Sequence, residues 1–201
     1  MNKFIYTISF IFIFYTHLIY GFEFSAMTLN TQNLFDTTDD LKKDDKAYLP
    51  IELKQSKAHI SSCNKIKVKS WREECLYLDW DNDTKDIKLA NLVKNIISYD
   101  KNGPDILALQ EVENINILKQ LFLLLEPYGY IDYELLESND YRGIDTAFIS
   151  KFKILDSKLH YITFSGEFED KDTRPILDIS ININNSNVKI YNVHFPAGYH
   201  D

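Results

Sequence analysis

Five polar residues stand at the ends of apolar segments, where side chains of different strands could meet and do chemistry together. They are Asn33, Glu111, Asp145, Arg174 and His194. Residues 106–110 show the pattern most clearly, because the apolar run Ile-Leu-Ala-Leu leads through Gln110 directly into Glu111. A carboxylate at the end of a buried strand is costly to desolvate unless a positive charge lies beside it. We therefore expect a cation at Glu111.

These residue types fit the handling of a phosphate ester. Glu111 and Asn33 offer oxygen ligands suited to a hard cation such as Mg²⁺, with Mn²⁺ or Ca²⁺ as alternatives. Arg174 can neutralise a phosphate, and His194 can donate a hydrogen bond to a phosphoryl oxygen or carry a proton. Asp145 can orient the imidazole ring.

Each of the five residues taken alone also fits a purely structural role, since short motifs match by chance. Asn33 could simply end a strand, and His194 could be a hydrogen-bonded core histidine. Asp145 and Arg174 could form an ion pair with each other. Only the set as a whole favours phosphoester chemistry.

The composition describes one globular domain with an acidic surface. The chain has 201 residues, a net charge of −8 and 45% hydrophobic residues, enough for a single real core. Such a charge excludes a broad basic face that binds nucleic acid without sequence preference. A nucleic-acid substrate would therefore need a local basic patch or a bound cation, and a phospholipid head group or a small phosphate ester fits equally well.

The first half of the chain is predicted to hold a strand, an insertion and an αβα unit. Residues 26–35 alternate as a strand does, and residues 36–85 form a polar insertion with local structure around residues 71–80. The crowded acids of the insertion predict a solvated face, because a calcium site here would lack EF-hand spacing; they are Asp39, Asp40, Asp44 and Asp45. A helix over residues 86–98, capped by Asp86, precedes the strand 106–110.

The second half is predicted to be mostly strands. A helix capped by Asn114 and ended by Pro127 comes first. Strands are then expected within residues 130–137, 143–150 and 153–163, followed by a hairpin of residues 176–183 and 188–195. This order predicts a mixed sheet with helices on one face, whose other apolar face needs a cover.

The N-terminus and the two cysteines point to an oxidising compartment. Residues 1–21 have one early Lys, an apolar run and Gly21 as a cleavage point, typical of a signal peptide; an uncleaved membrane anchor is the alternative. We expect a secreted or periplasmic domain over residues 22–201. There Cys63 and Cys75 would form a disulfide, the alternative being two unpaired thiols in the insertion.

Five segments in this order resemble the motifs of the endonuclease/exonuclease/phosphatase (DNase I-like) family. They are NTQNLFD (30–36), PDILALQEVEN (104–114), YRGIDTAFIS (141–150), TRPIL (173–177) and NVHFPAG (192–198). The resemblance implies an α/β fold of four layers, an αββα sandwich, with the active site at one end. It also implies that Asn33 and Glu111 hold the catalytic Mg²⁺.

The resemblance assigns roles to the other polar residues as well. Asp145 matches the acid that pairs with the active-site histidine, and His194 matches the histidine that contacts the phosphate. Arg174 matches an arginine that helps to hold the site together. Arg142 precedes the Gly-Ile-Asp element and would reach the phosphate.

The family pattern continues beyond the NVHFP element with Gly-Asp-Phe-Asn-like and Ser-Asp-His-like elements, which do not follow His194 before Asp201. We therefore expect the N-terminal portion of a secreted Mg²⁺-dependent nuclease or phosphatase, with an incomplete second sheet. Loss of coupled catalytic groups predicts little or no activity for the chain alone. The alternatives are a non-catalytic secreted binding protein and half of a split enzyme completed by a second chain. Contact with a membrane is expected only through an uncleaved signal.

Overall fold

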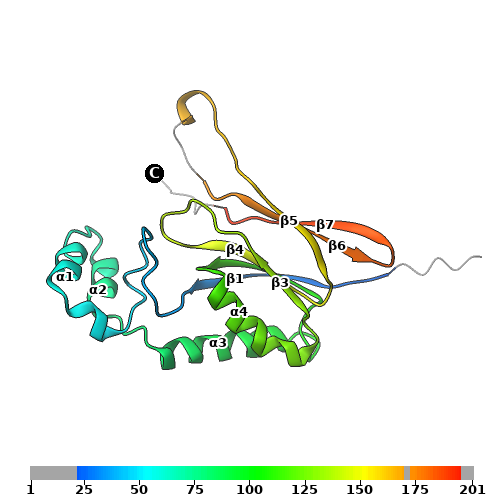
Figure 1. Ribbon diagram of the computed structural model, residues 1–201, viewed down its shortest axis with the longest axis horizontal. Helices are drawn as coiled ribbons and strands as arrows, with labels where there is room; N and C mark the ends of the chain where they lie inside the picture. The colour runs from blue at the N-terminus through cyan, green and yellow to red at the C-terminus, as the bar shows by residue number, and fades with distance from the viewer. Residues whose placement is uncertain (1–21, 170–172, 196–201) are drawn as a thin grey trace, which may run out of the picture.

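The computed structural model describes residues 22–169 and 173–195 and contains two β-sheets flanked by helices on one side (Figure 1). The predicted signal peptide, residues 1–21, lies outside the described residues. Within the described ranges, no helix has both the length and the apolar character needed to cross a membrane.

The first sheet is mixed and has the strand order β1-β2-β4-β3. Strand β1 (Ala26–Leu34) runs parallel to β2 (Ile106–Val112), while β4 (Asp145–Ser150) is antiparallel to both β2 and β3 (Asp132–Leu135). A parallel pair needs a long crossover, and the segment between β1 and β2 supplies it. The predicted strands are present in this sheet; β1, β3 and β4 are slightly shorter than expected, and β2 extends two residues further, to Val112.

The second sheet is antiparallel and has the order β5-β6-β7. Its strands are β5 (Ile154–His160), β6 (Ile176–Ile183) and β7 (Ser186–Asn192). Alternate residues of β6, such as Ile179 and Ile181, are fully buried against Ile106 and Phe148 of the first sheet. The predicted α/β class with two packed sheets is confirmed, and the sheets do not close into a barrel.

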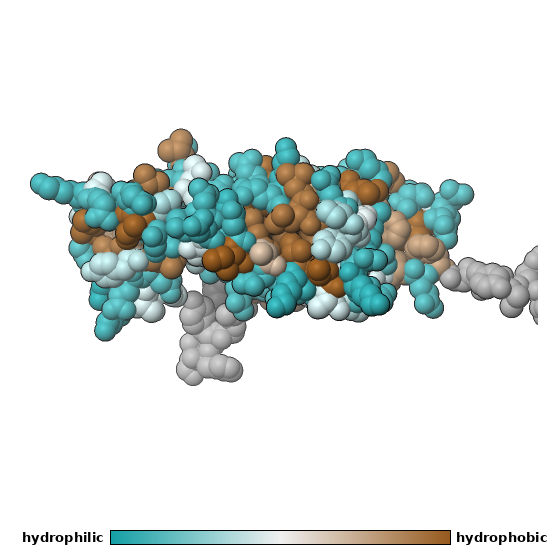
Figure 2. Space-filling model, turned by 90° about the horizontal axis from the view of Figure 1, so that it is seen from below, coloured by the Kyte–Doolittle hydropathy of each residue, from teal (hydrophilic) through white to brown (hydrophobic). Residues whose placement is uncertain are grey.

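Two helices cover the other face of the first sheet (Figure 1). Helix α3 (Asn82–Ile97) and helix α4 (Ile115–Leu125) bury their apolar stripes there, including Ile96 and Leu121. Their outer sides border an apolar groove of about 700 Å³, and Figure 2 shows the exposed apolar side chains on this face. The helices thus anchor the sheet but leave part of their own surface apolar.

The predicted cap of α4 is confirmed and that of α3 is wrong. Asn114 accepts hydrogen bonds from the backbone N–H groups of Asn116 and Ile117. Helix α3, however, begins before Asp86, because the side chain of Asp81 accepts a bond of 2.8 Å from the N–H of Thr84. A side chain that can satisfy an early N–H fixes where a helix starts.

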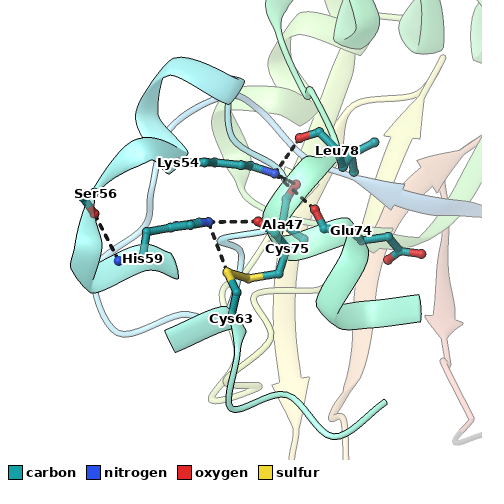
Figure 3. Close-up of a disulfide and its surroundings, with 8 residues drawn as sticks. All are labelled: Ala47, Lys54, Ser56, His59, Cys63, Glu74, Cys75 and Leu78. Carbon is teal, nitrogen blue, oxygen red and sulfur yellow. Dashed lines mark hydrogen bonds between the residues drawn. A yellow bond between two sulfur atoms is a disulfide. The ribbon is translucent and has the colours of Figure 1, made fainter. Parts of the chain in front are cut away.

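The insertion is more ordered than the sequence suggested. It contains a 3₁₀ helix η1 (Ile51–Gln55), helix α1 (Lys57–Cys63) and helix α2 (Lys69–Tyr77). Cys63 and Cys75 form a disulfide between α1 and α2 (Figure 3). The buried amine of Lys54 donates hydrogen bonds to the backbone carbonyls of Ala47, Glu74 and Leu78. The predicted solvated acidic face is wrong for Asp45, of which only 1% is exposed.

Candidate active site

The regular pairing of β1 and β2 breaks at the same end of the first sheet. The register shifts between Asn30 and Leu34 on β1, and between Gln110 and Val112 on β2. Asn33 and Glu111 both lie in these breaks and have φ angles of 63°, in the left-handed region. Such bulges redirect side chains next to active sites, and the strained backbone persists only where its surroundings enforce it.

The break in β2 brings the Glu111 carboxylate between the other strand ends. Its Oε2 accepts a hydrogen bond of 3.1 Å from the backbone N–H of Asn33, and its Oε1 lies 3.4 Å from Nε2 of His194. The adjacent His194 imidazole, and to a lesser extent Asn30 and the N–H of Asn33, lower the pKa of Glu111 to about 2, although burial opposes them. Glu111 is therefore ionised at neutral pH.

His194 reaches Glu111 from the second sheet. Only 12% of its side chain is exposed, and its Nδ1 is buried without a hydrogen-bond partner among the described residues. The imidazole is held beside the carboxylate through Nε2, which leaves Nδ1 for a ligand. A buried polar atom without a partner is unusual enough to mark a binding site.

Asp145 lies near the Glu111 end of β2, and no hydrogen bond joins it to His194 among the described residues. It begins β4 opposite Val112, and both of its carboxylate oxygens accept from the backbone N–H of Ser138, at 3.2 and 3.3 Å. Burial raises the pKa of Asp145. The predicted pairing of Asp145 with His194 is thus replaced by a bond to the nearer Ser138 N–H, and a catalytic role of Asp145 stays a prediction.

Arg142 and Arg174 meet at one acid, Asp140. Arg142 donates to both oxygens of Asp140, at 3.3 and 3.0 Å, and Nε of Arg174 lies 3.3 Å from Oδ2 without hydrogen-bond geometry. The alternative that Arg174 pairs with Asp145 is therefore wrong, since Asp140 takes that place. Two guanidinium groups on one carboxylate leave a surplus positive charge.

Sequence reasoning missed Asp140, Asn192 and Gln110. Nδ2 of Asn192 donates to the backbone carbonyls of Leu109 and Ala147, and its Oδ1 accepts a bond of 2.7 Å from Gln110. A usable signal was present, because Asn192 and Gln110 are polar residues inside otherwise apolar strand ends. Asp140 could have been suspected from its position two residues before Arg142.

The arrangement suits a cation and a phosphate. Glu111 is ionised and partly accessible, with 20% of its side chain exposed, and Asn33, whose backbone N–H bonds to this carboxylate, has a side-chain amide that can supply a second oxygen ligand. Carboxylate and amide oxygens are ligands that Mg²⁺ accepts. The residues present therefore fit a hard divalent cation, while His194 and the two arginines fit an anion.

Comparison with known proteins gives one family and several distant structures. Residues 76–200 match the model of the Endonuclease/Exonuclease/phosphatase family. No curated protein matches the chain. A family protein from Leptotrichia buccalis C-1013-b is 22% identical, with a TM-score of 0.41 over 58% of this chain and 50% of that chain.

Two further solved structures are similar to a larger share of the chain. ANGEL2, a 2′,3′-cyclic phosphatase, is 18% identical, with a TM-score of 0.45 over 86% of this chain and 41% of its own. A β-hairpin deletion mutant of beta toxin from Staphylococcus aureus is 13% identical, with a TM-score of 0.42 over 86% and 51%. The chain thus spans about half or less of the length of these structures.

Proposed function

Because this chain belongs to the endonuclease/exonuclease/phosphatase family, we propose that its strand ends form the cation- and phosphate-binding part of a secreted, Mg²⁺-dependent phosphoesterase. The observation that carries the proposal is the meeting of Asn33 and Glu111 from the first sheet with His194, which follows β7 of the second. Residues so far apart in the sequence converge on one ionised carboxylate.

Asn33 and Glu111 would hold the cation, which supplies charge stabilisation to the phosphoryl oxygens when bound. His194 would donate a hydrogen bond to the same phosphoryl group. Arg142 and Arg174 would add positive charge, held in place by Asp140. We assign no general base among the described residues, so we expect the chain by itself to bind phosphate esters better than it hydrolyses them.

The net charge of the chain bears on the class of substrate. With a net charge of −8, the chain lacks the broad basic surface that sequence-independent nucleic-acid binding requires. A small phosphate ester or a phospholipid head group therefore suits the site at least as well as a nucleic acid. Secretion, with residues 1–21 as the signal peptide, belongs to the proposal. A second chain that contributes to the enzyme remains the alternative, and co-purification of such a chain would support it.

The test compares wild type with Glu111→Gln, His194→Ala and the control Glu126→Gln, whose side chain is exposed on another part of the fold. Mg²⁺ binding is measured by calorimetry, and turnover with bis-p-nitrophenyl phosphate and plasmid DNA. We expect Glu111→Gln alone to lose Mg²⁺ binding. We expect His194→Ala to lower any turnover by ~10²–10³-fold, as loss of one hydrogen-bond donor to developing negative charge does.

The control variant should behave like wild type in both measurements. Equal Mg²⁺ binding by wild type and Glu111→Gln would overturn the proposed cation site. Mg²⁺ binding without turnover in any variant would favour the non-catalytic binding protein over the enzyme.

A further inference from the structure

Three carboxylates that take no part in the site described above converge near the N-terminal end of α4. Asp40, Asp45 and Glu113 each offer an oxygen atom, and these oxygens lie within 4.8 Å of one another. Asp45 is 1% and Glu113 3% exposed, so the group is largely inside the protein. Carboxylates so close together and so buried repel one another unless something neutralises them.

In each of the three carboxylates, one oxygen accepts a hydrogen bond that holds the group in place. The N–H of Asp40 donates to Oδ2 of Asp45 at 2.7 Å, and the N–H of Asp36 donates to Oε2 of Glu113 at 2.7 Å. Asn114, the cap of α4, donates to Oδ2 of Asp40 at 3.2 Å. These bonds fix the heads of the acids without neutralising them.

One oxygen in this group is buried and has no partner. Oδ1 of Asp45 accepts no hydrogen bond among the described residues, although the carboxylate head faces Asp40 and Glu113. The nearby cation Lys43 does not serve the group, because its amine donates to the backbone carbonyls of Ser138 and Asp140. An unpartnered buried carboxylate oxygen needs a ligand.

We propose that Ca²⁺ binds between Asp40, Asp45 and Glu113. Calcium takes oxygen ligands at about 2.3–2.6 Å, so two oxygens on opposite sides of the ion lie about 4.6–5.2 Å apart. Oxygens within 4.8 Å of one another can therefore surround Ca²⁺. Three buried carboxylates favour Ca²⁺ over Mg²⁺, because Ca²⁺ accepts several protein oxygens in flexible geometry whereas Mg²⁺ demands near-octahedral coordination and keeps several waters. The site differs from the Asn33–Glu111 pair and does not rest on the proposed function.

The ion would brace the loop that follows β1 against residues 138–142, the segment that carries Asp140 and Arg142. The N–H of Asp44 bonds to the carbonyl of Tyr141 at 2.7 Å, and Lys43 bonds to the same segment. Asp140, the acid shared by Arg142 and Arg174, lies in that segment. Calcium at the carboxylates would thus order the support of the arginines from outside the active site.

The test is a calorimetric titration of the chelator-treated chain with Ca²⁺, repeated with three variants. Asp45→Asn removes the charge of the carboxylate that has the unpartnered oxygen. Glu111→Gln removes the cation site proposed at the strand ends. Asp44→Asn is the matched control, because it makes the same charge change on an exposed neighbouring residue. We expect Glu111→Gln and Asp44→Asn to keep a Ca²⁺ site. We expect Asp45→Asn to bind there roughly tenfold more weakly or not at all, because Ca²⁺ affinity depends on the number of charged ligands.

Thermal unfolding with and without Ca²⁺ shows whether Asp45→Asn still folds. In chelator this variant should melt at or above the wild-type temperature, because it removes a buried unpaired charge. With Ca²⁺, wild type should melt higher and Asp45→Asn should not shift. Wild-type Ca²⁺ affinity in Asp45→Asn, or loss of all Ca²⁺ binding in Glu111→Gln, would overturn the proposal.

Discussion

Asn192 joins the two sheets with its side chain and so places the histidine that follows it. It belongs to β7 of the second sheet, yet it bonds to the carbonyls of Leu109 on β2 and Ala147 on β4. Only 2% of the residue is exposed. Because His194 comes two residues later, this bridge sets how closely the imidazole can approach Glu111.

We predict that Asn192→Ala destabilises the protein by about 2–4 kcal/mol, since it leaves buried hydrogen-bonding groups without partners. Asn187→Ala, on the exposed part of the same strand, should change the free energy of unfolding by no more than about 0.5 kcal/mol. Urea unfolding of the two variants measures the difference. Equal effects would mean that Asn192 does not bridge the sheets.

For the individual site residues, the sequence predicts which side chains come together but not which hydrogen-bond partner each one takes. Asn33, Glu111 and His194 were found because polar residues end apolar strands, and strand ends converge in a sheet. Asp145 was assigned to His194, but the N–H of Ser138 competes for its carboxylate. That competition depends on the path of the loop before β4, which no periodicity describes.

Tertiary contacts hold together the three short helices of the insertion, η1, α1 and α2. Lys54 is 2% exposed, and its amine donates to the carbonyls of Ala47, Glu74 and Leu78 at 2.7, 3.3 and 2.6 Å (Figure 3). Helices as short as α1 and α2 are marginal by themselves. Their sequence therefore carries a weak signal, whereas α3 and α4 were predicted from long apolar stripes.

We predict that Lys54→Met destabilises the insertion by about 1–3 kcal/mol or more, because buried carbonyls lose their donor. Lys57→Met, on the exposed side of α1, should have little effect. The variants are compared by hydrogen exchange of the amides in α1 and α2 at pH 7. Unchanged exchange in Lys54→Met would show that the amine is not needed there.

The pH dependence of the same region gives an independent check. Burial lowers the pKa of Lys54 from 10.5 to about 8. Between these values the unfolded chain binds more protons than the folded chain, so the contribution of Lys54 to stability rises as the pH increases. The stability gap between wild type and Lys54→Met should therefore widen from pH 7 to pH 10.

The whole molecule makes the active site by packing one sheet on the other. Glu111 belongs to the first sheet and His194 follows the second, and between the sheets lies an interior that includes Ile106, Phe148 and Ile179. The alternation of residues 176–183 predicted a strand with one buried face. It did not predict what covers that face, and the two-sheet packing was expected only from the family resemblance.

If the sheets form one cooperative unit, damage to the second sheet must weaken the first. We predict that Ile179→Ala, at a fully buried position of β6, lowers the free energy of unfolding by about 2–5 kcal/mol. The chain has two tryptophans, Trp71 and Trp80, and neither lies in the second sheet. Their fluorescence therefore reports on the part of the molecule that the substitution does not touch.

We expect this fluorescence to show a single urea transition, whose midpoint is lower in Ile179→Ala than in wild type. The control is Ile87→Ala on α3, where the side chain is 64% exposed, and its midpoint should be close to that of wild type. Coupling of this kind follows because the shared interior transmits the loss of packing to both sheets. An unchanged tryptophan transition, with strand signals lost earlier by circular dichroism, would mean that the sheets unfold separately. The contact between His194 and Glu111 would then persist only while the weaker sheet stays folded.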